Sequence, residues 1–86
     1  MTGAKLSSAD DLPLSEILAQ RISPLVETMD DLKAGDLYTL IMDQVEKPLL
    51  EMTLKKAGGN QLKAAQALGI NRNTLRKKIR YHNIKS

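Results

Sequence analysis

The chain has 86 residues, enough for one small domain, and 42% of them are apolar. It contains no Cys and one His, which excludes disulfides, thiolate metal sites, thiol redox chemistry and a multi-histidine metal site within one chain. No apolar run approaches the ~20 residues that span a bilayer, and residues 1–11 lack the apolar stretch of a signal peptide. We therefore expect a soluble cytoplasmic protein, with no membrane association, that gains stability from a partner subunit.

The charges are segregated along the chain. Residues 1–54 hold all ten acidic residues and four basic ones, whereas residues 55–86 hold nine basic residues and no acidic one. Apolar residues recur periodically through the basic segment, so it is expected to fold rather than form a solvated tail. An acid-free basic segment of this kind indicates a polyanion-binding half joined to a half with another task.

Two long helices are predicted in the first half of the chain. Pro13 suits a first helical turn, and apolar residues follow at helical spacing to Met29, with a bend expected at Pro24. After a polar connector, Asp36 is expected to cap a second helix that is kinked at Pro48 and ends at Gly58-Gly59. Its apolar band is wide, which predicts a homodimer interface. Met29, Met42 and Met52 are assigned to the core.

Two short helices are predicted next, and no segment alternates like a strand. Asn60 is expected to cap a helix over 61–68 with Leu62, Ala65 and Leu68 inward, and Gly69 to close it in a left-handed conformation. Asn71 is expected to cap a last helix from Arg72 to about Tyr81, buried through Leu75 and Ile79. The predicted fold is all-α with four helices: residues 1–12 form a flexible arm, 13–57 the dimerisation helices, and 58–86 a helix-turn-helix.

The segment 61–80 has the layout of a helix-turn-helix, with small Ala64 and Ala65 where a second helix can cross closely. Side chains near the start of such a recognition helix reach base edges in the major groove, where Arg reads guanine and Asn reads adenine. Lys and Arg further along reach phosphates, as can the start of the preceding helix. The candidate DNA-binding residues are Asn60, Gln61, Asn71, Arg72, Asn73, Thr74, Arg76, Lys77, Lys78 and Arg80.

The run from Gly59 to Ile79, GNQLKAAQALGINRNTLRKKI, resembles the DNA-binding end of the factor for inversion stimulation (Fis) family. The segments Asp36-Leu37-Tyr38 and 45–52, VEKPLLEM, are similar to the family's second helix, proline included, and the resemblance runs from Pro13 to Lys85. Part of the pattern is shared with the C-terminal domains of nitrogen-regulator (NtrC-type) activators, so a DNA-binding domain of such an activator stays the alternative.

The resemblance implies a homodimeric, nucleoid-associated regulator that bends double-stranded DNA and favours an AT-rich centre, reading it mostly by shape. It further implies that Asn71 and Arg72 contact base edges and that Arg80 contacts flanking DNA. It implies backbone contacts from Asn60, Gln61, Thr74, Arg76, Lys77 and Lys78.

The chain departs from the family pattern at several places. Residues 1–12 are short for the hairpin that touches an invertase, which puts a recombinase partner in doubt. Leu62 stands where the pattern has a polar residue, Asn73 where it has Gly, and Tyr81-His82-Asn83-Ile84 replaces a more basic end.

No grouping of residues favours an enzyme, a cofactor or a metal. His82 is interpreted as a polar residue at a helix C-terminus, Glu46 as surface charge, and Asp43 as solvated surface, since the aspartates fit no metal loop. An alternative of another class is a helical protein-interaction module without nucleic acid, for which residues 13–54 are suited.

Overall fold

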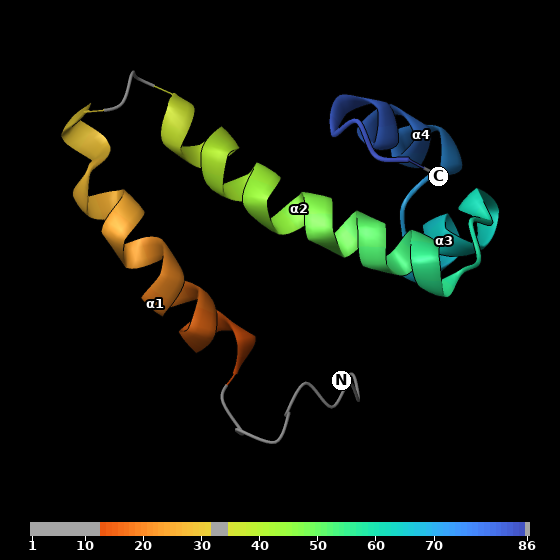
Figure 1. Ribbon diagram of the computed structural model, residues 1–86, viewed down its shortest axis with the longest axis horizontal. Coiled ribbons are helices and arrows are strands. Elements are labelled where there is room, and N and C mark those ends of the chain that lie inside the picture. Colours follow the sequence, from red (N-terminus) through yellow and green to blue (C-terminus); the bar gives the residue numbers. More distant parts are fainter. Residues whose placement is uncertain (1–12, 32–34, 86) are drawn as a thin grey trace. The chain divides into compact units, whose positions relative to one another are not determined.

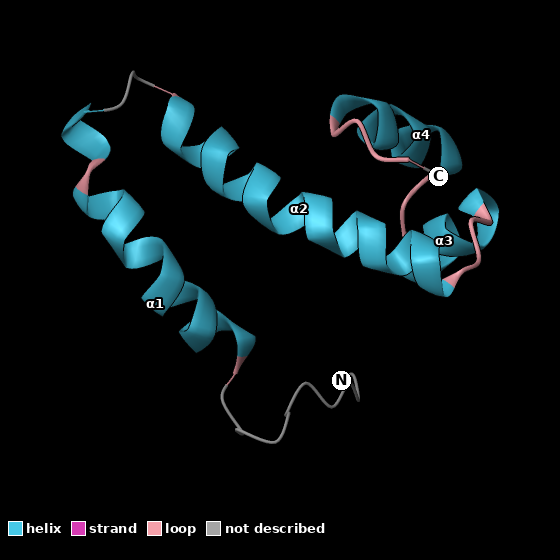
Figure 2. Ribbon diagram, viewed as in Figure 1, coloured by secondary structure: helices cyan, strands magenta, loops and turns pink. Residues whose placement is uncertain are grey.

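The computed structural model describes residues 13–31 and 35–85, and within them it contains helices and no strand (Figures 1 and 2). The elements are α1 (Leu14–Glu27), the short 3₁₀ helix η1 (Met29–Asp31), α2 (Asp36–Lys56), α3 (Gln61–Leu68) and α4 (Arg72–Tyr81). The all-α fold with two long and two short helices is thereby confirmed. The arm predicted over 1–12 lies outside the described residues.

Helix α1 begins after Pro13 and continues through Pro24. It ends at Glu27, two residues earlier than predicted, because Thr28 turns back on the helix: its hydroxyl donates to the Leu25 carbonyl at 2.9 Å. The polar connector expected after Met29 begins with η1, a single 3₁₀ turn. Considered alone, α1 has no buried residue, so its apolar side chains have no core of their own.

Helix α2 runs for 21 residues with Pro48 inside it. Asp36, expected to precede the helix as its cap, is its first residue, where a carboxylate stabilises the positive end of the helix dipole. Lys55 and Lys56 lie in the last turn, where cations are favourable. Beyond it, the Gly59 N–H donates to the Leu54 carbonyl at 2.9 Å with φ +84°, so the helix ends at the glycine pair as predicted.

Helices α3 and α4 have the predicted bounds and caps. The Asn60 side chain accepts from the Lys63 N–H, and the Asn71 side chain accepts from the Asn73 N–H. Gly69 between the helices has φ +76°, and its N–H donates to the Ala65 carbonyl at 2.9 Å. This left-handed conformation costs glycine little, which explains the tight turn.

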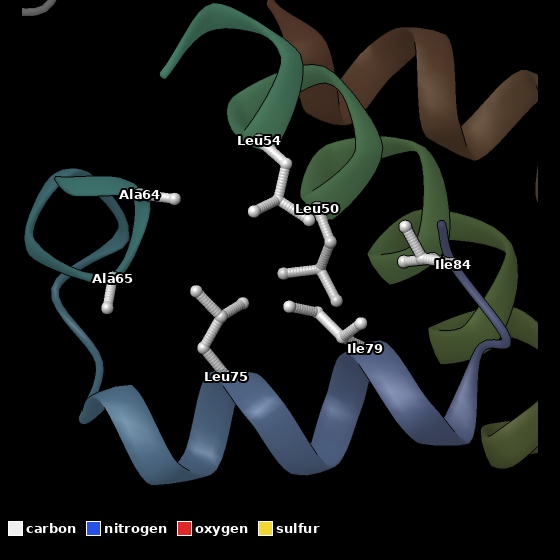
Figure 3. Packing of buried hydrophobic residues seen from close by; sticks show 7 residues of the cluster. All are labelled: Leu50, Leu54, Ala64, Ala65, Leu75, Ile79 and Ile84. Atoms are coloured by element: carbon white, nitrogen blue, oxygen red, sulfur yellow. The ribbon is translucent and has the colours of Figure 1, made fainter. Parts of the chain in front are cut away.

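One hydrophobic core lies where α2, α3 and α4 meet, within the compact unit that starts at Leu40. In Figure 3 the side chains of Leu75 and Ile79 extend from α4 toward Leu50 and Leu54 of α2. Ala64 and Ala65 of α3 complete the core together with Ile84, and Ala57, Leu68 and Ile70 pack at its edge. The methyl side chains of the alanines allow α3 to lie close to Leu75, which is fully buried.

Two expectations about the core are wrong. Leu62 is 50% exposed, because Ala64 and Ala65 take the inward positions of α3. Met29, Met42 and Met52 are exposed in the single chain rather than buried. For Met42 and Met52 the reason is that α2 contributes only its Leu50 and Leu54 face to the core.

Candidate nucleic-acid interface

Helix α4 separates an apolar face from a basic one. Leu75 and Ile79, one turn apart, are buried against the core. The predicted contact residues that α4 leaves exposed are Arg72, Asn73, Thr74, Arg76, Lys77 and Arg80. No acidic residue occurs between Arg72 and Tyr81, so the exposed face of α4 carries only positive charge.

Two of the three asparagines among the predicted contacts, Asn60 and Asn71, cap helices. Asn71 Oδ1 accepts from the Asn73 N–H at 2.7 Å, and Asn60 Oδ1 accepts from the Lys63 N–H at 3.0 Å. Capping uses the amide oxygen of each side chain, while an asparagine also has an NH₂ group with two donors. Both residues are exposed at helix N-termini, where backbone N–H groups and the helix dipole favour an anion.

All the remaining predicted contacts except Arg72 and Asn73 line two depressions beside α4. Gln61, Arg76 and Arg80 line a shallow depression that Ile79, Asn83 and Ile84 share. On the other side, Thr74, Lys77 and Lys78 line a second depression with Glu46 and Tyr81. Gln61, the first residue of α3, therefore lies beside Arg76 and Arg80. Lys77 and Lys78 lie beside Glu46 of α2.

Lys78 differs from the other basic residues of α4. Its Nζ donates to Glu46 Oε2 at 2.8 Å, and its side chain is 36% exposed. A lysine held in this way is already paired with a carboxylate from α2, whereas Arg72, Arg76, Lys77 and Arg80 are all exposed.

The same carboxylate holds a buried histidine. His82 Nε2 lies 2.8 Å from Glu46 Oε1, and the His82 side chain is only 4% exposed. His82 does cap the C-terminus of α4, as its interpretation as a terminal polar residue requires. The interpretation of Glu46 as surface charge is wrong, because Glu46 joins α2 to Lys78 of α4 and to the cap residue His82.

A third polar contact lies one residue away. The Tyr81 hydroxyl donates to Asp43 Oδ2 at 2.8 Å. Asp43 therefore has a partner in α4, whereas the sequence analysis interpreted it as solvated surface. The Tyr81 and His82 rings meet edge to face with centroids 4.8 Å apart. The partners in the three hydrogen bonds between α2 and the end of α4 are more than 30 residues apart, and no local spacing in the sequence indicates such pairs.

These contacts shift two protonation equilibria. The hydrogen bonds from Lys78 and His82 hold the pKa of Glu46 below its usual range. The bond to Asp43 raises the pKa of Tyr81. Glu46 is therefore an ionised acceptor at neutral pH, and His82 must present its Nε2 proton to it.

The described residues contain no group of three or more His, Cys, Asp or Glu side chains arranged to hold a metal. Among the same residues, no helix is long and apolar enough to cross a membrane.

The core, the glycine turn and the exposed basic helix define the C-terminal part of the chain as a helix-turn-helix unit. Residues 41–81 match the family model described as bacterial regulatory protein, Fis family. The chain is 39% identical over 83 residues to the DNA-binding protein Fis of Proteus vulgaris, an alignment that covers 93% of this chain and 89% of that protein. It is 40% identical over 74 residues to the DNA-binding protein Fis of Actinobacillus succinogenes, covering 86% and 75% of the two chains. The chain belongs to the Fis family, as its resemblance predicted.

Proposed function

We propose that this protein is a homodimeric, DNA-binding and DNA-bending regulator, in which α4 of each copy enters the major groove. The observation that carries the proposal is the acid-free face of α4, fixed on the core through Leu75 and Ile79. The relatives named above are described as DNA-binding proteins, and the matching family model as a bacterial regulatory protein. Residues 13–57 would serve dimerisation and residues 58–86 DNA binding.

Sequence reading is assigned to the first turn of α4. Arg72 has a guanidinium fork that can pair with the O6 and N7 atoms of guanine, and the Asn71 NH₂ group lies next to it in sequence. Asn73 adds an exposed amide where the family pattern has glycine. Arg76, Lys77 and Arg80, further along, would contact phosphates and fix the helix in the groove.

The start of α3 is assigned to the DNA backbone. Asn60 and Gln61 are the cap and first residue of that helix, so backbone N–H groups there can approach a phosphate. Thr74 would add a hydroxyl contact from α4. Lys78 can reach a phosphate only in competition with Glu46, to which it is bonded.

Dimerisation is supported by a second apolar face of α2. Tyr38, Met42, Val45, Leu49 and Met52 recur at alternating spacings of four and three residues, the pattern of a helix seam that packs on another helix. All but Val45 are exposed, and Tyr38 is 75% exposed. This face differs from the Leu50 and Leu54 face, which the core already covers.

Two recognition helices on one dimer would require the DNA to bend if they lie closer together than one turn of DNA. Bending costs on the order of 1–6 kcal/mol and depends on the sequence deformed. An AT-rich centre, whose minor groove narrows readily, would then be favoured without base contacts. Such a protein would act at the nucleoid in the cytoplasm, with double-stranded DNA as its partner and no cofactor.

Gel-shift measurements with a duplex of AT-rich centre at about 50 and 200 mM salt test the proposal. If the dimer neutralises roughly 6–10 phosphates, affinity should fall by roughly 10³–10⁵ between the two conditions. Slower migration of fragments bent at their middle than of fragments bent at their end would show the bend. A nearly flat salt response would overturn the assignment of α4 as the contact surface.

A further inference from the structure

We propose that Glu46, which lies on α2 and outside the basic face, is a positioning residue for the recognition helix. The inference rests on the DNA-binding function proposed above and adds to it how the direction of α4 is fixed. Glu46 would act through Lys78 and His82, without touching DNA.

The geometry of the carboxylate carries the inference. Its two oxygens accept from the last turn of α4 and from its cap, Oε2 from Lys78 Nζ and Oε1 from His82 Nε2, both at 2.8 Å. Lys78 and His82 are four residues apart and therefore lie on one side of the helix. A single side chain from α2 thus holds a complete turn of α4 at two points.

The burial of His82 makes the contact hard to replace by water. Its side chain is 4% exposed, and a buried polar group left without a partner is costly. Tyr81, bonded to Asp43, adds a link from α2 to the same end of α4. With the apolar core on one side and these links on another, α4 has little freedom to rotate about its axis. Its orientation determines which base edges Arg72 and Asn73 can reach.

A competing interpretation is that Glu46 masks Lys78. In that case Glu46 lowers DNA affinity, both by occupying a lysine that could bind phosphate and by its own negative charge. When the hydrogen bonds from Glu46 to Lys78 and His82 are removed, positioning predicts a lower DNA affinity and masking predicts a higher one. The two can therefore be separated by variants that have the same charge.

The comparison is between Glu46→Ala and Glu46→Gln. Both remove one negative charge, but glutamine keeps an oxygen for Lys78 and an amide for His82, whose ring can take the tautomer with an Nε2 acceptor. We expect Glu46→Ala to bind a strong site about tenfold more weakly than Glu46→Gln. The salt dependence of the two should be equal, because both variants lack the carboxylate that competes with a phosphate for Lys78.

Matched controls are Glu51→Ala and Glu51→Gln, which remove an exposed carboxylate from the same helix. These two should bind alike. A third variant, Glu46→Leu, fills the same space with an apolar side chain and guards against loss of folding in Glu46→Ala, since apolar replacement of buried ionic groups is often tolerated. It should bind as weakly as Glu46→Ala, with unchanged helicity by circular dichroism.

Each outcome decides one point. Tighter binding by Glu46→Ala than by the unaltered chain, with a steeper salt dependence, would show masking and overturn the inference. Equal affinities of the alanine, leucine and glutamine variants would also overturn it. If the unaltered chain does not bind the duplex at all, the proposed function fails before the variants are compared.

Discussion

His82 caps the C-terminus of α4, and its Nε2 atom lies 2.8 Å from Oε1 of Glu46, a residue 36 positions earlier in α2. The contact ties the end of the basic helix to the helix that also supplies Leu50 and Leu54 to the core. The apolar core and the polar contacts therefore both fix α4 against the same helix, α2.

Acidification should lower the free energy of unfolding by weakening the contacts of Glu46. Because the folded-state pKa of Glu46 lies below its ordinary value of 4.5, its contribution to stability is present above that value and is lost as the pH falls through the lower folded pKa. Urea unfolding at about pH 7 and about pH 3.5 measures the loss. We expect Glu46→Gln to lose less stability on acidification than the unaltered chain. The control Glu51→Gln, which leaves the Lys78 and His82 bonds in place, should retain the full loss; equal losses in all three would contradict the prediction.

The second apolar face of α2 should mediate a homodimer. At micromolar concentration, sedimentation should give about twice the chain mass of 9.5 kDa. Met42→Lys places a charge on the proposed seam and should shift the equilibrium to monomer, because burying an unpaired charge is costly. Gln44→Lys adds the same charge to another exposed position of α2 and should remain dimeric. A monomeric unaltered chain would exclude the dimer.

Arg72 and Lys77 should affect DNA binding in different ways. Arg72→Ala should cost about 1–3 kcal/mol and reduce the preference for guanine at the edges of the site, since its fork is assigned to a base. Lys77→Ala should weaken all sequences alike and lower the salt slope by about one unit for each phosphate that is no longer neutralised. Both are measured on one strong site and one edge-substituted site. Full discrimination by Arg72→Ala would make Arg72 a backbone contact.

Gly69 should be sensitive to substitution for a backbone reason. Its φ of +76° lies in the left-handed region, and beyond Gly69 and its two neighbours in the chain no atom lies within 4 Å of where a Cβ would be. Gly69→Ala should therefore cost about 1–2 kcal/mol through strain alone, with a smaller cost for Gly69→Asn, which tolerates this region better. Thermal unfolding of the two variants tests this; equal costs would point to something other than backbone conformation.

Helix bounds, caps and turns that are set by residues close together in the chain could be predicted from the amino-acid sequence. Asn60, Gly69 and Asn71 set the bounds of α3 and α4 through caps and a left-handed turn, which are local interactions. The periodic apolar residues of α4 identified Leu75 and Ile79 as its buried face. The chemistry of the opposite face, basic and without acid, follows from the same spacing and led to the candidate interface.

Packing between the helices, by contrast, selects which of several apolar faces is covered and how the charges pair. On α3, Ala64 rather than Leu62 faces inward, because the close crossing of α4 leaves room for a methyl group and not for a larger side chain. Glu46 joins Lys78 and His82 across more than 30 residues, a proximity that exists only once α2 and α4 share a core. Local spacing cannot encode such a pair, since its geometry is created by the tertiary fold.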